Sequence, residues 1–157
     1  MNNARSTDEN LELLRRIHIT TPRETELLRH LARVLRKGPN GEPSAEAARF
    51  TATGETRGIL VIGEPGDGKS SLVSHVLSKH PALGDGPTGT PRFVDALVPT
   101  PGTLKNMGTE ILDKTGYQKV PGRRDAFDIW KLVRKRLTFF GYTVLWIDEA
   151  HDLFAKD

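Results

Sequence analysis

The sequence lacks cysteine, long hydrophobic runs and internal repeats. Without cysteine, the chain can form neither disulfides nor thiolate metal sites. No apolar run approaches the roughly 20 residues that a membrane-spanning helix needs, so we expect no membrane partner. The first residues, from Met1 to Thr7, lead into charged sequence without the apolar stretch of a secretory signal. These absences together favour a cytoplasmic protein.

An excess of charge of one sign is also missing. The 157 residues include 23 basic and 20 acidic side chains, which gives a net charge of +3. That balance permits an anionic partner, but by itself it does not indicate nucleic acid. The length is enough for one domain with a sizeable core and too short for two ordinary domains.

Residues 1–56 are predicted to form a helical N-terminal extension and a flexible connection. Apolar residues at three-residue spacings favour a short amphipathic helix over residues 8–18. Glycine, proline and small polar residues dominate residues 38–56. We expect a surface connection there, with at most a partial turn near residues 45–50.

A clearer helix is predicted between these two segments. Thr21 offers a hydroxyl at the N-cap, Pro22 fits the first helical position, and Glu24 can reach back to the cap amide. A stripe of leucine and valine follows this capping box and ends before Gly38. We predict a helix that ends near Lys37 and buries one face.

Residues 57–157 alternate apolar strands with helices. Strands are predicted at residues 58–62, 92–98 and 143–147, and helices at residues 71–80, 101–115 and 125–140. The first strand is a continuous aliphatic run, the pattern of a strand buried on both faces of a parallel sheet. The alternation predicts an α/β fold of three layers, with a mostly parallel sheet between helices.

The last two of these helices carry apolar stripes. Thr100 and Pro101 would supply the N-cap and the first residue of one helix, and Leu104 begins its stripe. Phe127 begins the stripe of the other helix. We expect both Leu104 and Phe127 to be buried.

A glycine-rich loop joins the first strand to the first of these helices. A nucleoside triphosphate needs many hydrogen-bond donors at close range, and glycines let successive backbone N–H groups point inward towards it. Lys69 would reach the β- and γ-phosphates, and the Ser70 hydroxyl would ligate Mg²⁺. We therefore predict an ATP and Mg²⁺ site formed by Gly63, Glu64, Pro65, Gly66, Asp67, Gly68, Lys69, Ser70 and Ser71. A chance match is the alternative, and the flanking strand and helix argue against it.

Asp67 departs from what this loop usually contains. It puts a carboxylate inside the phosphate cradle, where an uncharged residue is more usual. This raises a question about the affinity for nucleotide rather than about the kind of site.

The third predicted strand ends in two carboxylates, Asp148 and Glu149. Ligands bind parallel α/β sheets at the carboxyl ends of the strands, so Asp148 can hold Mg²⁺ or its waters there. Glu149 is placed to polarise an attacking water as a general base. Together with Lys69, which would contact the γ-phosphate, it is a candidate catalytic residue. The alternative is a strand that merely ends in solvent-facing carboxylates.

These motifs resemble those of the AAA+ ATPases over roughly residues 57–154. Lys69 and Ser70 match the Walker A motif, and Asp148 and Glu149 match the Walker B pair. The segments 147–154, 101–105 and 21–23 look like those of the TniB group, ATP-binding accessory proteins of transposition related in style to MuB and ExeA. The resemblance implies DNA and a transposase as partners and a homo-oligomer in the complete form. It also suggests that His151 couples the nucleotide site to a partner, although a plain surface or N-capping histidine fits as well.

The chain departs from the family pattern after Glu149. In AAA+ proteins, the strand that carries the sensor 1 residue lies between the Walker A and Walker B strands and comes later in sequence. That strand, the arginine finger and the helical lid have no counterpart here. We expect a sheet that is incomplete at the C-terminus, with unpaired strand edges, and a chain in which nucleotide binding is favoured over unaided hydrolysis.

Basic residues outnumber acidic ones around the last helix. The cluster comprises Lys119, Arg123, Arg124, Lys131, Arg134, Lys135 and Arg136, against Asp125 and Asp128. A solvated helix face is one interpretation, and DNA contact through Arg134 or Arg136 is the other.

The resemblance to the TniB group implies an ATP-dependent regulator of transposition in which hydrolysis acts as a timer. A non-hydrolysing ATP-binding adaptor is the rival from another class. A secretion-type or other P-loop ATPase outside transposition is the third alternative.

Overall fold

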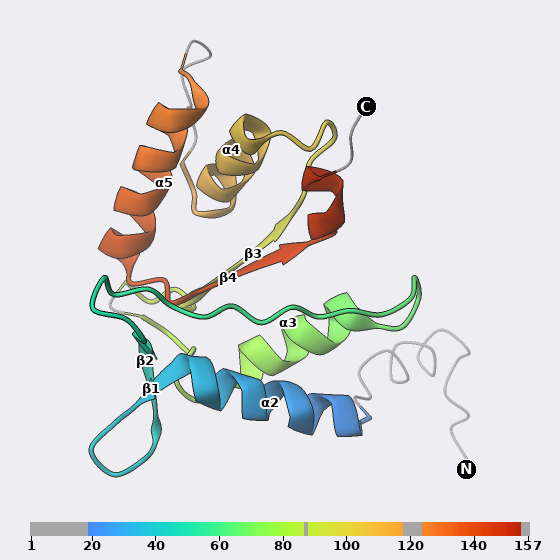
Figure 1. The fold of residues 1–157 in the computed structure, drawn as a ribbon, viewed down its shortest axis with the longest axis vertical. Coiled ribbons are helices and arrows are strands. Elements are labelled where there is room, and N and C mark those ends of the chain that lie inside the picture. The colour runs from blue at the N-terminus through green and yellow to red at the C-terminus, as the bar shows by residue number, and fades with distance from the viewer. Residues whose placement is uncertain (1–18, 87, 118–123, 155–157) are drawn as a thin grey trace, which may run out of the picture.

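The computed structural model describes residues 19–86, 88–117 and 124–154 (Figure 1). The helix predicted over residues 8–18 therefore lies outside the described residues. Among the described helices, none combines the length and the hydrophobicity that crossing a bilayer requires. In chain order the elements are α2 (Pro22–Val34), β1 (Leu35–Lys37), β2 (Pro43–Ala47), α3 (Lys69–Lys79), β3 (Phe93–Leu97), α4 (Leu104–Lys114), α5 (Ala126–Phe140), β4 (Val144–Asp148) and the 3-10 helix η1 (Ala150–Leu153).

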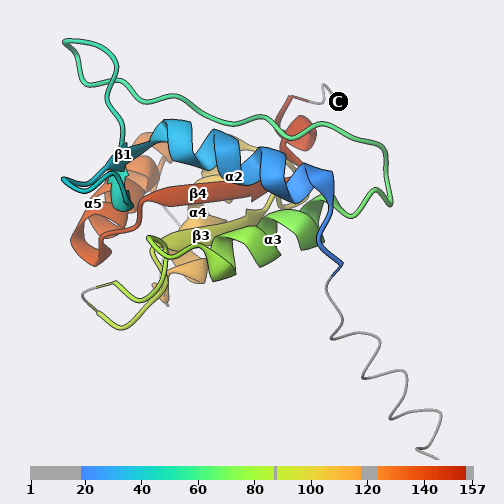
Figure 2. The ribbon, with the colours of Figure 1, turned by 90° about the horizontal axis from the view of Figure 1, so that it is seen from below.

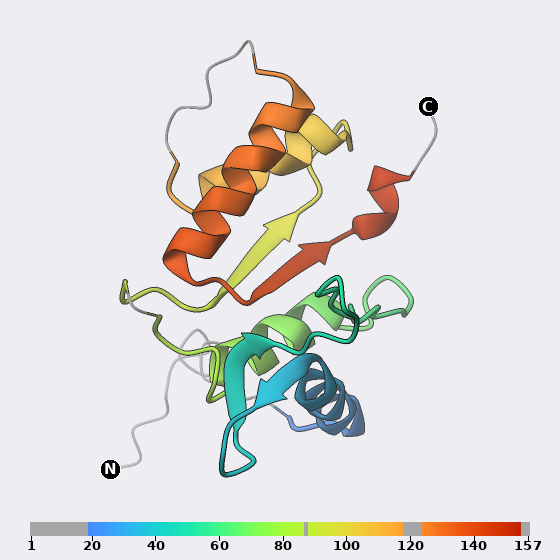
Figure 3. The same ribbon diagram turned by 60° about the vertical axis from the view of Figure 1, so that its left-hand side comes forward.

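The strands β3 and β4 form a parallel pair between two layers of helices (Figure 3). Their register runs from Phe93 opposite Val144 to Leu97 opposite Asp148, so both strands end at the same edge. Helices α4 and α5 lie on one face of the pair, and α2 and α3 lie side by side on the other (Figure 2). The predicted α/β class with a parallel sheet between helical layers is confirmed.

Two hydrophobic clusters fill the spaces between these layers, because alternate residues of a strand point to opposite faces. The first cluster joins β3 to α4 and α5 and comprises Val94, Ala96, Val98, Met107, Ile111, Leu112, Ile129 and Val133. The second cluster lies around α2 and α3 and comprises Leu27, Leu31, Leu35, Val73, Val76, Leu77 and Leu83. Phe93, Val144 and Trp146 on the other face of β3 and β4 pack against this second cluster.

The helix α5 has the boundaries that its sequence predicts. The Asp125 carboxylate accepts a hydrogen bond of 2.8 Å from the Asp128 amide, and the helix ends at Gly141, whose φ of 71° is left-handed. The start of α4 differs from the prediction. Its N-cap is Thr103, whose hydroxyl accepts from the Asn106 amide at 3.1 Å, so the helix begins three residues later than the Thr100 cap implied.

The buried faces of α4 and α5 are set by a glycine. A Cβ added to Gly108 would lie 2.6 Å from the Ile129 Cγ2 atom, so the absence of a side chain lets the two helices approach closely. Ile129 therefore points into the core, and Phe127 points away from it, since two residues turn a helix by about 200°. Phe127 is 75% exposed and Leu104 is 64% exposed, so the prediction that both are buried is wrong.

The N-terminal helix is shorter than predicted because its last residues join a hairpin. Helix α2 ends at Val34, and the strands Leu35–Lys37 and Pro43–Ala47 pair antiparallel. The predictions of a helix to Lys37 and of a turn near residues 45–50 are therefore wrong. Within the described part of the chain, the Thr21 hydroxyl makes no capping hydrogen bond, although the Glu24 amide donates to the Thr21 carbonyl at 3.0 Å.

The segment 58–62 is extended but forms no ladder with any strand of the described ranges, so the prediction of a buried strand is wrong. Figure 1 shows it running beside β4. Ile59 and Val61 pack against the cluster around α2 and α3, whereas Leu60 is 78% exposed and Ile62 is 84% exposed. Among the described residues, no strand lies between this aliphatic run and β4 to pair with both, which agrees with the expected incomplete sheet.

Candidate functional site

The loop between residues 63 and 70 is shaped by its glycines. Gly66 and Gly68 have φ angles of 85° and 72°, which residues with a side chain rarely adopt. A Cβ added to Gly63 would lie 2.8 Å from the Asp67 Oδ2 atom, so the loop closes tightly on its own first residue. Helix α3 begins directly after the loop, at Lys69. The free N–H groups of its first turn and its positive end therefore face the loop.

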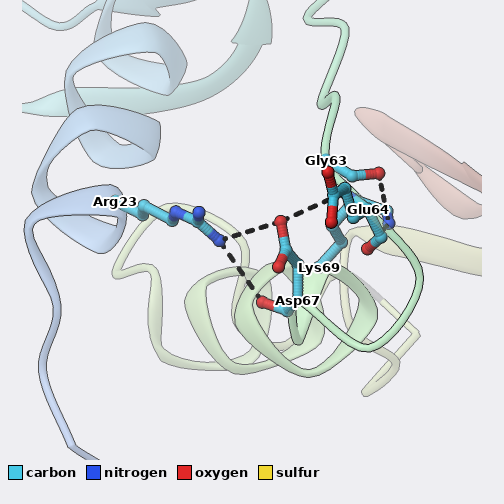
Figure 4. Close-up of polar contacts among 5 residues, drawn as sticks. All are labelled: Arg23, Gly63, Glu64, Asp67 and Lys69. Carbon is cyan, nitrogen blue, oxygen red and sulfur yellow. Dashed lines mark hydrogen bonds and ion pairs between the residues drawn. The ribbon is translucent and has the colours of Figure 1, made fainter.

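The Lys69 side chain folds back over the start of the loop (Figure 4). Its Nζ atom donates to the carbonyl oxygens of Gly63 and Glu64, each at 2.8 Å. The ammonium group thus stays at the mouth of the loop, held by neutral carbonyl groups. An ammonium bound in this way can exchange those carbonyls for phosphate oxygens, which form stronger charge-assisted hydrogen bonds.

Asp148 is the last residue of β4, at the edge where both strands end, and Glu149 follows it. The Glu149 amide donates to the Asp148 Oδ1 atom at 3.0 Å. Glu149 has a φ of 54°, which is uncommon for a residue other than glycine and marks strain of the kind that clusters at functional sites.

The imidazole of His151 lies between two carboxylates. Its Nδ1 atom is 3.3 Å from the Glu149 Oε2 atom, and its Nε2 atom is 3.3 Å from the Asp152 Oδ1 atom. All three side chains are about half exposed or more, so these contacts are weak. They nevertheless orient the Glu149 carboxylate from within η1.

The aliphatic run at residues 59–62, the loop and β4 line one hollow of about 640 Å³. From the loop it is lined by Gly63, Pro65 and Lys69, and from β4 onward by Asp148, Glu149 and His151. Its volume falls within the range of small-molecule sites, about 300–1,000 Å³. The structure therefore brings together the two motifs that the sequence analysis singled out.

A second hollow lies between the start of α2 and the loop. It is lined by Thr21, Pro22 and Arg23 from the start of α2 and by Asp67, Gly68 and Ser71. Ser70 lies beside it, exposed in the first turn of α3. Of the predicted loop residues, three line the first hollow and three line the second, whereas Glu64, Gly66 and Ser70 line neither of them.

The donors present suit a magnesium nucleotide. Lysine and arginine side chains with backbone N–H groups bind phosphate, and carboxylate and hydroxyl oxygens bind Mg²⁺. Lys69 and Arg23 provide the cations, and Ser70 and Asp148 provide the oxygen atoms. Nothing in the shape of the loop conflicts with these ligands except the Asp67 carboxylate.

Arg23 is the residue that sequence reasoning missed. Its Nη1 atom lies 3.4 Å from the Asp67 carbonyl oxygen and 3.5 Å from the Asp67 Oδ2 atom. The two residues are 44 positions apart, so no local pattern signals the contact. Within the sequence, the one signal for Arg23 is that it belongs to the segment 21–23, which resembles the TniB group.

Arg136 makes structural contacts within the chain. Its Nε atom donates to the Thr115 carbonyl at 3.0 Å and to the Thr115 hydroxyl at 2.9 Å, at the end of α4. Its guanidinium group also lies 4.6 Å from the centre of the Phe140 ring. Lys131, Arg134 and Lys135 are exposed on α5, and Lys119 and Arg123 lie outside the described residues.

The comparisons with known proteins agree with this geometry. The family model described as an AAA domain matches residues 52–157, which is more than half of the chain. No curated protein and no solved structure gave a match. AAA domains bind nucleotide, and the matched range contains both the glycine-rich loop and the carboxylates after β4. The chain therefore belongs to the AAA domain family.

Proposed function

We propose that this chain binds ATP with Mg²⁺ and forms the nucleotide-binding part of an ATP-dependent accessory protein of DNA transposition. The observation that carries the nucleotide site is the hollow that Lys69 shares with Asp148 and Glu149. Residues 57–157 form the ATPase part and residues 1–56 its extension in this proposal, and the protein acts in the cytoplasm.

Each site residue has a distinct role in the proposal. Lys69 leaves the carbonyls of Gly63 and Glu64 and binds the β- and γ-phosphates. Ser70 and Asp148 hold Mg²⁺, which, when bound, neutralises charge that develops on the phosphates. Glu149 orients a water molecule for in-line attack on the γ-phosphate.

Calorimetric titration of the chain with ATP and Mg²⁺ tests the binding site. We expect Lys69→Ala to weaken ATP binding by at least about tenfold, since a charge-assisted phosphate contact contributes roughly 1.5–3 kcal/mol. Lys79→Ala is the matched control, because Lys79 lies exposed in the last turn of the same helix. Equal ATP affinities for the two variants would refute the assigned site.

Hydrolysis separates the enzyme from the non-hydrolysing adaptor. The chain offers Glu149 as a base, but an arginine that stabilises the transferred phosphate would come from a neighbouring subunit of a homo-oligomer. Glu149→Gln should abolish phosphate release from such an assembly and leave ATP binding unchanged. If the unmodified protein releases no phosphate when assembled, the adaptor is favoured.

The role in transposition rests on the resemblance to the TniB group and on the exposed cations of α5. Phosphate contacts through Lys131, Arg134 and Lys135 would give DNA binding that weakens steeply as salt rises. Arg134→Ala should reduce both the affinity and the salt dependence, and Arg29→Ala on α2 is the control. No binding to duplex DNA at low salt would remove DNA as a partner and favour an ATPase outside transposition, such as the secretion type.

A further inference from the structure

The Asp67 carboxylate occupies the inside of the loop. Its Oδ2 atom accepts a hydrogen bond of 3.1 Å from the Glu64 amide and lies 3.5 Å from the Arg23 Nη1 atom. Figure 4 shows the carboxylate between the guanidinium group and the first residues of the loop. The loop therefore contains an anion of its own, bound by one backbone N–H group and one cation.

This internal anion conflicts with an incoming phosphate. Two like unit charges about 4 Å apart repel each other by about 1 kcal/mol in water and by about 4 kcal/mol near a protein surface. A triphosphate carries several such charges. The Asp67 carboxylate must therefore turn out of the loop when the phosphates enter it.

The departure of the carboxylate changes the surroundings of Arg23. The guanidinium group reaches the loop from the first turn of α2 and is 62% exposed, so its side chain can turn without breaking the core. Glu26, one turn further along α2, is 3.8 Å from Arg29 and so already has a cationic partner. The phosphate that displaces Asp67 then takes its place as a partner of Arg23.

We propose that Arg23 is a phosphate-binding residue of the nucleotide site, which Asp67 keeps at the loop until phosphate replaces it. The proposal rests on the proposed nucleotide site and adds a contact from outside the glycine-rich loop. Asp67 and Arg23 have opposite effects on the affinity for nucleotide, because Asp67 competes with the phosphates and Arg23 binds them. Asp67 also positions the guanidinium group of Arg23 at the loop. The net affinity for nucleotide depends on both.

The two residues can be tested separately by measuring Kd for ATP and for inorganic triphosphate, which has no base. Asp67→Asn keeps a similar shape and removes the charge, and we expect both ligands to bind about five- to tenfold more tightly. Arg23→Ala should weaken both by about three- to tenfold. The double variant Arg23→Ala/Asp67→Asn should bind more weakly than Asp67→Asn alone.

A matched ion pair on the hairpin controls for general effects of charge. Arg36 and Glu46 lie 3.0 Å apart, and both side chains are exposed. The substitutions Arg36→Ala and Glu46→Gln should leave the affinities for ATP and for inorganic triphosphate unchanged. Thermal melts of all variants show whether each one folds.

Three results would overturn the proposal. One is an Asp67→Asn variant that binds no more tightly than the unmodified chain. Another is an Arg23→Ala substitution that has no effect in the Asp67→Asn background, because Arg23 would then only neutralise Asp67. The third is an effect of Arg23 on ATP but not on inorganic triphosphate, because the contact would then be to the nucleoside. The nucleotide site itself fails separately, if Lys69→Ala has no effect on binding.

Discussion

Gly102 provides a direct test of how the site is supported. This residue lies between β3 and α4, and a Cβ added to it would lie 2.3 Å from the Asp152 carbonyl oxygen and 2.9 Å from the Asp152 carbonyl carbon. Both atoms belong to the backbone of η1, which follows Glu149 and carries His151. The perturbation is the substitution Gly102→Ala, which adds one methyl group at this contact.

The magnitude follows from the contact distances. Backbone atoms cannot rotate away, so η1 and the loop at Gly102 must separate by about 1 Å to restore an ordinary contact, and such overpacking costs about 1–3 kcal/mol. For a chain of this size, each kcal/mol lowers the melting temperature by about 2–4 °C. We therefore expect a decrease of about 2–12 °C. The shift of η1 should also move the Glu149 carboxylate away from the nucleotide.

Thermal unfolding with and without ATP and Mg²⁺ measures both effects. Gly84→Ala is the control, because no atom lies within 4 Å of the added Cβ and the backbone there is not left-handed. It should leave the melting temperature unchanged or raise it slightly. A Gly102→Ala variant as stable as the Gly84→Ala variant would refute the close packing of the residue 102 loop on η1.

Three further predictions concern the support of the fold. Burial lowers the pKa of His80 below its ordinary value of 6.5, so the unfolded chain takes up a proton at a higher pH than the folded chain does. The contribution of neutral His80 to the free energy of unfolding in urea should be fully present above pH 6.5 and should fall as the pH drops below 6.5. His80→Gln should flatten this pH dependence, and an unchanged pH profile would contradict the prediction. Arg136→Ala should lower the free energy of unfolding in urea by about 2 kcal/mol, because the hydrogen bonds to Thr115 are lost. Arg136→Lys should not restore these hydrogen bonds, so full stability of the lysine variant would argue against the paired contacts. Asp125→Ala should cost about 1 kcal/mol through the lost helix cap, while Asp125→Asn should lose less, a difference that urea midpoints resolve.

The parts of the fold that the sequence predicted correctly depend on local signals. The Asp125 cap and Gly141 fix the two ends of α5, and the aliphatic residues before Asp148 predict β4 directly. Glycines in the loop at residues 63–68 have the left-handed conformations that the phosphate-binding pattern requires. In each case, the residues that determine the conformation lie within a few positions of one another.

The errors arose where distant partners decide the outcome. Leu35 leaves the helical pattern because the hairpin with β2 supplies its backbone partners. The aliphatic run at residues 58–62 has the composition of a buried strand, but a strand needs a neighbour, and none of the described strands pairs with it. The contact of Arg23 with Asp67 likewise joins residues that no short pattern connects.

The two hydrophobic clusters imply that the molecule opens in two cooperative steps. The glycine-rich loop precedes α3, whose buried residues belong to the cluster with α2. Asp148 ends β4 and Glu149 follows it, and β4 is paired with β3, which packs on α4 and α5. These halves meet mainly through Phe93, Val144 and Trp146. Amide hydrogen exchange should therefore reveal two sets of protected amides with different opening free energies. A nucleotide that touches both Lys69 and Asp148 would lie across the boundary between them, and its binding would slow exchange in both sets together.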